Sequence, residues 1–375
     1  MLLAWNGPTN AAESAVLLRR EIPLLRELVA NGVQPSVVLF DDRTGARLEF
    51  EAAGIDVHAI AAPLPPSVAA LRYLPSAVLR LRPLLRSLRP DVLEGNEPMP
   101  AIALGLAARG NSKRGVVIYR RLHARGGKRL QSASWIAARL TDRTLVLSEA
   151  TRRDAISDEG TRRELIDVAP SGSISPRQVP ADEIAAARRT AGIADGARVI
   201  GVVSRFRHEK GLDILLRALD SLRDLQGVHV VLAGDGPAEA ALRELAVRAP
   251  LPVHFVGHRD DIEVWYAIAD VMVMPSRRES FGRVSTEVMA SARPVVATRV
   301  GGLVETVADG ETGLLVPPDD PVALASAIRT ILSDRELSAR MGAAARARFE
   351  ARYTIAHMAA GRLAAWKNAV RTVAR

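Results

Sequence analysis

Short runs of apolar residues alternate along this chain with longer segments in which apolar residues recur every three or four positions. The short runs are typical of strands buried on both faces of a parallel sheet, and the longer segments are typical of amphipathic helices. The pattern predicts strands in the first half at residues 2–5, 36–40, 57–60, 92–94, 116–119, 144–147 and 165–169, and in the second half at 199–203, 228–233, 253–256, 271–275, 294–298 and 313–316. Helices fit between them, for example at 12–31, 211–222 and 238–248. Such alternation predicts an α/β fold with doubly wound, parallel sheets.

Two series of this kind follow one another, and 375 residues are enough for two separate cores. The segment 170–180 is rich in Ser, Pro and Gly, as linkers commonly are. We therefore predict an N-terminal domain at 1–175 and a C-terminal domain at 176–354, followed by a last helix at about 355–375.

The composition is that of a soluble protein, with 48% hydrophobic and 25% charged residues. The chain has no cysteine, which excludes disulfides and thiolate chemistry and allows a reducing cytosol. Residues 1–5 fit a first strand better than a signal peptide, and no apolar run is long enough to span a bilayer. These features predict a cytoplasmic protein.

The formal net charge is +9, from 51 Lys and Arg against 42 Asp and Glu. A basic balance allows binding to nucleic acid, anionic lipid or phosphorylated substrates. Nucleic acid is the weakest of the three, because the chain has no zinc-finger spacing, RNP-like aromatic motif or heptad seam.

Two basic groups stand out within this charge. The first is Arg72, Arg80, Arg82, Arg86 and Arg89, and the second is Arg120, Arg121, Arg125, Lys128 and Arg129. The first group is either a solvated helix face or a site of peripheral attachment to the inner face of an anionic membrane. The second group suggests that the molecule on which the protein acts is phosphorylated or acidic.

The densest functional signal is the segment that reads Glu279-Ser-Phe-Gly-Arg-Val-Ser-Thr-Glu287. It follows the predicted strand 271–275, and residues 283–292 are predicted to be helical. The free N–H groups at such a helix start attract phosphate, and Gly282 lets a ligand approach the backbone closely. An isolated pair of glutamates at this spacing is more often two solvated charges, so the neighbouring motifs decide its interpretation.

Further motifs follow the strands of the second half. Arg205 comes after strand 199–203, and Lys210-Gly211 opens the next helix, so both cations are predicted at the carboxyl edge of the sheet. Arginine and lysine neutralise a diphosphate well, although an exposed strand-end cation would look the same. Gly257 and His258 follow a third strand and are candidates for a nucleobase slot, with an ordinary loop histidine as the favoured alternative.

Several other glycines are interpreted from the sequence only as turn residues. Gly234-Asp235-Gly236 is a tight turn after strand 228–233. The pairs Gly301-Gly302 and Gly310…Gly313 frame a strand, and as turns they require no functional role.

In this order, over about 180 residues from Val199, these motifs resemble the nucleotide-sugar half of the retaining family 4 glycosyltransferases. The resemblance implies the GT-B fold, in which two Rossmann-like domains face a central cleft and the last helix returns to the N-terminal domain. By this resemblance Arg205 and Lys210 bind the diphosphate, Glu287 binds the ribose hydroxyls, and Glu279 contacts the donor sugar near its reacting carbon or its 3- and 4-hydroxyls. The predicted donor-binding residues are Arg205, Lys210, Gly234, Gly257, His258, Ser280, Phe281, Gly282 and Glu287.

The first half contributes further candidate positions. The family places a histidine near the donor's 6-hydroxyl after a strand that corresponds to 116–119, which makes His123 the second catalytic candidate beside Glu279. Where the family has a Gly-Gly pair after the first strand, this chain has Asn10-Ala11-Ala12, and alanine restricts positive φ. Glu94 and Asn96, at a strand end, are candidates for acceptor contact.

No two aspartates stand two residues apart, so the Asp-x-Asp clamp of metal-dependent sugar transferases is absent. Cations and a helix dipole would then stabilise the departing diphosphate, with no metal and no cofactor beyond the donor. The resulting prediction is transfer of a sugar from UDP- or GDP-sugar, with retention, to a hydroxyl of a carbohydrate, phosphorylated or lipid-linked acceptor. The alternatives are a sugar phosphorylase or epimerase of the same fold, and a non-catalytic protein that binds nucleotide sugar or lipid.

Overall fold

The computed structural model describes every residue except 6–10, 43, 65–71, 110–114, 122–127 and 374–375. The chain divides into two units, one formed by Met1–Ser171 with Ile355–Arg375 and the other by Gly172–Thr354. The expected boundary after residue 175 lies close to this division, and the last helix belongs to the N-terminal unit.

In the described part of the N-terminal unit, seven parallel strands form a sheet in the order β3-β2-β1-β4-β5-β6-β7. They are β1 (Leu2–Trp5), β2 (Ser36–Leu39), β3 (Asp56–Ala59), β4 (Val92–Asn96), β5 (Val116–Arg121), β6 (Arg143–Val146) and β7 (Ile166–Val168). The helices are α1 (Ala11–Ala30), α2 (Ala46–Ala52), α3 (Leu74–Leu88), α4 (Pro98–Ala108), α5 (Lys128–Leu140), α6 (Glu149–Glu159) and α15 (Ile355–Val373).

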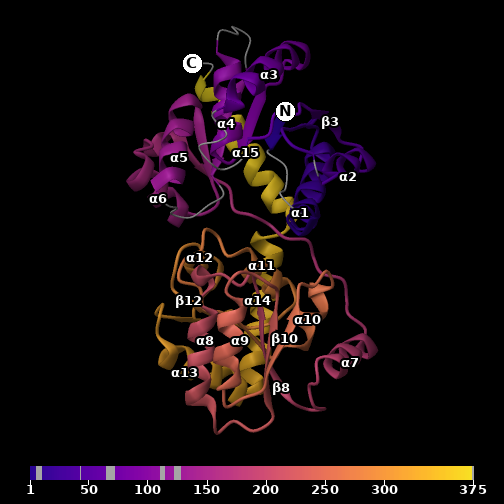
Figure 1. Cartoon of the computed structure of the whole chain (residues 1–375), viewed down its shortest axis with the longest axis vertical. Coiled ribbons are helices and arrows are strands. Elements are labelled where there is room, and N and C mark those ends of the chain that lie inside the picture. The colour runs from indigo at the N-terminus through magenta and orange to yellow at the C-terminus, as the bar shows by residue number, and fades with distance from the viewer. Residues whose placement is uncertain (6–10, 43, 65–71, 110–114, 122–127, 374–375) are drawn as a thin grey trace. The chain divides into compact units, whose positions relative to one another are not determined.

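Helices cover both faces of this sheet, because successive strand residues point to opposite sides. Leu2 and Ala4 of β1 pack in the core beneath α3 and α4, whereas Leu3 and Trp5 pack in the core beneath α1 and α15. Helix α4 packs against both α3 and α5, and almost all of its residues are buried (Figure 1).

A buried ionic cluster attaches α15 to the sheet. Nη2 of Arg362 lies 2.6 Å from Oε1 of Glu94, and the Trp366 indole donates to Oε2 of the same carboxylate at 2.9 Å. Glu21, also buried, lies 3.7 Å from Nη1 of Arg362. Glu94 is therefore fully buried beneath α15 rather than free to contact an acceptor, because a charge in the core needs compensating partners.

Six parallel strands form the sheet of the C-terminal unit, in the order β10-β9-β8-β11-β12-β13. They are β8 (Arg198–Val203), β9 (Val228–Ala233), β10 (Val253–Gly257), β11 (Val271–Met274), β12 (Val295–Thr298) and β13 (Gly313–Val316). The helices are α7 (Ala181–Thr190), α8 (Leu212–Ala218), α9 (Glu239–Val247), α10 (Ile262–Ile268), α11 (Arg283–Ala290), α12 (Leu303–Thr306), α13 (Pro321–Ser333) and α14 (Arg335–Arg352). The predicted helix 211–222 ends earlier than expected, because residues Leu219–Leu222 continue as a 3₁₀ turn.

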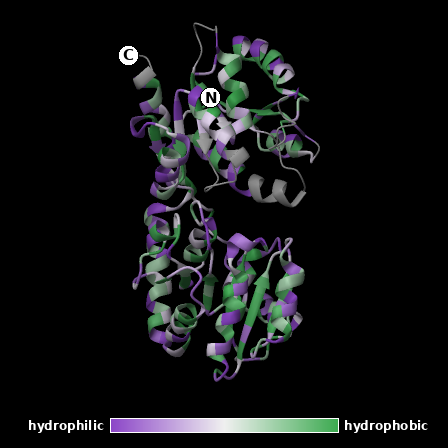
Figure 2. Ribbon diagram, turned by 60° about the vertical axis from the view of Figure 1, so that its left-hand side comes forward, coloured by the Kyte–Doolittle hydropathy of each residue, from purple (hydrophilic) through white to green (hydrophobic). Residues whose placement is uncertain are grey.

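The two sheets confirm the predicted doubly wound α/β class. Their strands are largely hydrophobic, whereas the surrounding helices carry both polar and apolar residues (Figure 2). Among the described residues, no helix is both long and apolar enough to cross a membrane.

Candidate functional site

The candidate site lies where the strand order of the C-terminal sheet reverses. From β8 the chain proceeds to β9 and β10 on one side, and it then returns to β11 on the other side of β8. Open α/β sheets bind ligands at the carboxyl ends of strands at such a switch point. The loop after β8 carries Arg205 and Lys210, and the loop after β11 carries Glu279 and Ser280.

Lys210 and Glu279 meet although they are 69 residues apart in the sequence. Nζ of Lys210 lies 2.6 Å from Oε2 of Glu279, and the two side chains are 27% and 13% exposed. A charge-assisted hydrogen bond of this length fixes the direction of both side chains. The ammonium thus has a negative partner, and both groups keep some access to solvent.

The start of α11 follows this pair directly. Gly282 caps the helix with φ of 84°, and a Cβ atom added there would lie 2.5 Å from Cδ2 of Leu303. Phe281 is buried with its ring against that of Tyr353, at a centroid distance of 6.0 Å. Phe281 therefore anchors the loop in the core, while the first turn of α11 has N–H groups that lack intrahelical partners.

Glu287 is held by a residue that the sequence reasoning missed. The hydroxyl of Tyr266 on α10 donates to Oε2 of Glu287 at 2.7 Å, and Nε of Arg283 lies 3.4 Å from Oε1. Burial, and after it the charge of Glu287, raise the pKa of Tyr266 well above its ordinary value. The tyrosine therefore remains a proton donor and orients the carboxylate. No local motif marks Tyr266, because the contact joins two helices.

Gly301 and Gly302, which the sequence presented as turns without a functional role, support the Glu279 loop. A Cβ atom on Gly301 would lie 1.7 Å from the carbonyl oxygen of Glu279, and one on Gly302 would lie 2.5 Å from Cα of Phe281. Since these contacts are with backbone atoms, no side-chain rotation would relieve them. The interpretation as simple turns was therefore incomplete, and the only sequence signal was a glycine pair just after a strand end.

Gly234, just after β9, and Gly257, the last residue of β10, pack the neighbouring loops together. The Gly234 amide donates to the carbonyl oxygen of Gly257 at 2.7 Å, and a Cβ atom on Gly234 would lie 1.9 Å from the carbonyl oxygen of Ser204. Arg205 follows Ser204 and is exposed, as is His258. Gly234 and Gly257 thus shape the loop that presents Arg205.

The remaining predicted positions are in the N-terminal unit. His123 and Asn10 lie outside the described residues, and Ala11 and Ala12 form the first two positions of α1. Of the predicted catalytic pair, the structure therefore describes Glu279 alone.

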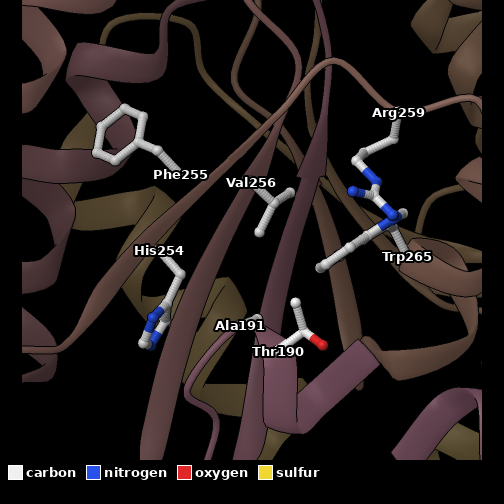
Figure 3. Close-up of a pocket in the computed structure, with 7 residues that line it drawn as sticks. All are labelled: Thr190, Ala191, His254, Phe255, Val256, Arg259 and Trp265. Carbon is white, nitrogen blue, oxygen red and sulfur yellow. The ribbon is translucent and has the colours of Figure 1, made fainter. Parts of the chain in front are cut away.

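A separate pocket of about 290 Å³ lies along the edge strand β10 (Figure 3). It is lined by Thr190, Ala191, His254, Phe255, Val256, Arg259 and Trp265. The Arg259 guanidinium lies over the Trp265 ring and pairs with both carboxylate oxygens of Asp261. None of the predicted donor residues lines this pocket, so we place the candidate site at the β8 and β11 loops.

Two family models match the chain. Residues 183–348 match the model described as glycosyl transferases group 1, and residues 23–173 match the model described as glycosyltransferase family 4. The chain belongs to the family 4 glycosyltransferases. This membership confirms the resemblance seen in the motifs of the second half.

Solved structures share the fold of this family 4 member over its whole length. A glycosyltransferase from Rickettsia africae has a TM-score of 0.81 at 17% identity and covers 99% of this chain and 98% of its own. Anabaena HepE, solved with UDP-glucose, has a TM-score of 0.76 at 24% identity and covers 100% of this chain and 98% of its own. These likenesses confirm the predicted GT-B architecture of two Rossmann-like units.

Curated relatives include several D-inositol 3-phosphate glycosyltransferases. That of Streptomyces avermitilis is 41% identical over 181 residues, which cover 44% of this chain and 39% of the relative. That of Nocardia farcinica is 37% identical over 217 residues, which cover 55% of this chain and 48% of the relative. The matches thus span less than half the length of these relatives.

Proposed function

We propose that this chain transfers a sugar from a nucleoside-diphosphate sugar to an acceptor hydroxyl. The observation that carries the proposal is the 2.6 Å contact between Lys210 and Glu279 at the switch point of the C-terminal sheet. It joins a cation suited to diphosphate and a carboxylate suited to sugar hydroxyls beside a helix N-terminus. Membership of family 4 supports the same reaction class.

In this proposal each donor group has its own recognition element. Arg205, Lys210 and the first turn of α11 bind the diphosphate, Glu287 binds the ribose hydroxyls, and Glu279 contacts the sugar. UDP is the first candidate nucleotide, because HepE was solved with UDP and with UDP-glucose, and GDP is the second. His123 and the Asn10-Ala11-Ala12 segment remain predicted contributions of the N-terminal unit.

We further propose transfer with retention and without a metal ion. Lys210, Arg205 and the α11 amides would stabilise the charge that develops on the leaving diphosphate, as preorganised dipoles and cations do. Rates should then be unchanged in EDTA, and NMR should show product with the donor's anomeric configuration. A rate restored only by a divalent ion would contradict the metal-free scheme.

The acceptor is proposed to be a phosphorylated polyol or carbohydrate. The named relatives act on D-inositol 3-phosphate, and the basic residues around His123 suit a phosphate.

Thermal shifts with UDP-, GDP- and ADP-sugars would identify the donor, because a bound ligand stabilises the native state. Release of nucleoside diphosphate should then require an acceptor such as inositol phosphate. Nucleotide-sugar binding without turnover across a broad acceptor panel would favour a non-catalytic binding protein instead.

Lys210→Ala should weaken UDP binding by about 10- to 100-fold, since charge-assisted contacts contribute about 1.5–3 kcal/mol. Calorimetry would measure the dissociation constant. Lys367→Ala is the matched control, because Lys367 is an exposed lysine on α15 in the other unit. Equal affinity of wild type and Lys210→Ala would remove Lys210 from the diphosphate site.

Peripheral contact with an anionic membrane is proposed for α3. Its buried stripe is Ala77, Leu81 and Leu85, and the helix contains no acidic residue. The exposed residues around that stripe and next to the helix include Arg72, Leu79, Arg80, Arg82, Arg86 and Arg89. Residues 57–141 contain 14 Lys and Arg and three Asp and Glu, which gives this segment a net charge of +11. Because the whole chain has a net charge of +9, all its other residues together have a net charge of −2. Such a concentration of charge with an exposed leucine suits an anionic lipid surface.

Exchange of Arg80, Arg82 and Arg86 for Ser should lower the affinity for phosphatidylglycerol-containing vesicles by about 100-fold, at about 1 kcal/mol per charge near the surface. Vesicle cosedimentation measures the effect, with pure phosphatidylcholine as the lipid control. The matched protein control exchanges Arg223, Arg243 and Arg340, exposed arginines of the C-terminal unit that pair with acidic neighbours. Equal losses in both triple variants, or binding to nucleic acid but not to vesicles, would contradict the proposal.

A further inference from the structure

Arg277 lies two residues before Glu279 and makes a multidentate set of contacts. Its Nη1 and Nη2 lie 2.7 and 2.8 Å from the two carboxylate oxygens of Asp213. Nη1 also donates to the carbonyl oxygen of His208 at 2.9 Å, and Nε donates to Asp319 at 2.7 Å. The side chain is 16% exposed. Only the planar fork of a guanidinium donates in all these directions at once.

These contacts join three connections at the carboxyl edge of the C-terminal sheet. His208 belongs to the 3₁₀ turn His208–Lys210 that ends in Lys210, and Asp213 lies in the first turn of α8. Asp319 lies between β13 and α13. Arg277 itself belongs to the loop from β11 to α11 that carries Glu279. The guanidinium therefore connects the segment that presents Lys210 to the segment that presents Glu279.

The backbone strengthens the same connection. The amides of Arg277 and Arg278 donate to the carbonyl oxygen of Glu209 at 2.8 and 3.3 Å. A Cβ atom on Gly211 would lie 2.0 Å from the carbonyl oxygen of Pro275, so the two loops touch directly behind the side chains. The Lys210 and Glu279 loops thus form one assembly, with Arg277 as its central side chain.

The charge of Arg277 is already compensated within the protein. Asp213 and Asp319 both pair with it, and Arg217 donates to Asp213 as well, at 3.1 Å. Hydrogen bonds from Arg277 hold the pKa of Asp213 below its ordinary value, so the partner carboxylate stays charged at neutral pH. Four of the five N–H groups of Arg277 already have acceptors in the protein, whereas Lys210 pairs with a single carboxylate. Arg277 is therefore better suited to hold loops together than to neutralise a ligand phosphate.

We propose that Arg277 is a positioning residue for sugar transfer, which fixes Lys210 and Glu279 relative to each other through Asp213 and the His208 carbonyl group. The inference rests on the proposed function. Its physical basis is that both acting side chains are on loops, and a misplacement of about 1 Å costs about 100-fold in rate. Arg277 contributes that precision without touching the substrate.

Arg277→Met tests the proposal, because it keeps an apolar side chain of similar length and removes the guanidinium group. We expect kcat to fall about 100-fold and the dissociation constant of UDP to rise several-fold. Arg277→Lys should resemble Arg277→Met more than wild type, since an ammonium cannot bridge both partners. Asp213→Asn should reduce kcat as well, and the double variant should lose little more than Arg277→Met alone, as coupled residues do.

Arg329→Met is the matched control for a purely structural role. Arg329 also grips an aspartate with two nitrogens, at 2.7 Å each to Asp224, and donates to the carbonyl oxygen of Ser221 at 2.6 Å. Asp224 lies in the segment that leads into the start of β9. This second ion pair is therefore at the amino-terminal edge of the sheet, whereas Lys210 and Glu279 are at the carboxyl edge. Arg329→Met should leave kcat and KM unchanged and should lower the melting temperature no more than Arg277→Met, because the Arg329 and Asp224 side chains are 37% and 62% exposed.

Hydrogen exchange separates this inference from the proposed function. In Arg277→Met, without any ligand, amides of residues 204–214 should exchange faster than in wild type, while Arg329→Met should leave them unchanged. Absence of transfer by wild type would overturn the proposed function, and the exchange data would still decide whether Arg277 joins the loops. Wild-type kcat and UDP affinity in Arg277→Met, unchanged exchange at 204–214, or an equal kinetic loss in Arg329→Met would overturn the positioning role.

Discussion

Glu279→Gln is expected to lower kcat by about three orders of magnitude and to leave the melting temperature nearly unchanged. The amide keeps the size of the side chain and an oxygen that accepts from Lys210, but it loses the negative charge. A positioned acid, base or electrostatic group contributes about 10²- to 10⁴-fold to a reaction. Little stability is lost, because both partners of the ion pair remain partly exposed and the ammonium can be solvated.

Initial rates of nucleoside diphosphate release measure this effect, with thermal melting as the test of folding. Glu336→Gln is the control, since Glu336 is 84% exposed on α14 and pairs with Arg340 one turn away. It should have wild-type rates. A Glu279→Gln enzyme with wild-type kcat would exclude Glu279 from the reaction, and a collapse in melting temperature would make its role structural.

Gly301→Ala should reduce both activity and stability, because the new methyl group would lie 1.7 Å from the carbonyl oxygen of Glu279. The backbone must shift to relieve this contact, and the shift displaces the residue that we place at the donor sugar. We expect at least about a 100-fold loss of kcat, by the same sensitivity to misplacement of about 1 Å. The left-handed conformation, with φ of 50°, adds about 1–2 kcal/mol of strain for any residue with a Cβ atom.

Gly310→Ala separates backbone strain from the steric clash. Gly310 has φ of 77° and open space around its Cα, so alanine there meets the strain without the contact. This variant should lose about 1–2 kcal/mol of stability and keep its kcat. If Gly301→Ala shows wild-type kinetics, or if both variants lose the same activity, the support of the Glu279 loop by Gly301 is refuted.

Much of the candidate site was visible in the sequence as separate motifs. The strand β11 reads Val-Met-Val-Met, a run typical of a strand buried on both faces, and Glu279 follows it at a loop position. Parallel strands place all such loops at one edge of a sheet, so Arg205, Lys210 and Glu279 were expected near one another. The pairing of Lys210 with Glu279, and not with another carboxylate, could not be inferred from that edge alone.

The supporting residues were invisible for a different reason. Gly301 and Gly310 both look like turn glycines in the sequence. A Cβ atom at Gly301 would clash with the Glu279 backbone, whereas a Cβ atom at Gly310 would have open space around it. Likewise Arg277 is one arginine in an arginine-rich chain, and its partner Asp213 is 64 residues away. Glu94, at a strand end, carried the signature of a site residue and is buried under Arg362 and Trp366.

The sequence by itself determined the alternation of strands and helices, the two-unit organisation and the family, because these depend on local periodicity and on residues close together along the chain. Only the tertiary structure decided which cation meets which carboxylate, which glycines are confined by a neighbouring backbone, and which charged residues are buried. Those properties depend on distances between segments that are far apart in the sequence, and local hydrophobic patterning contains no information on such distances.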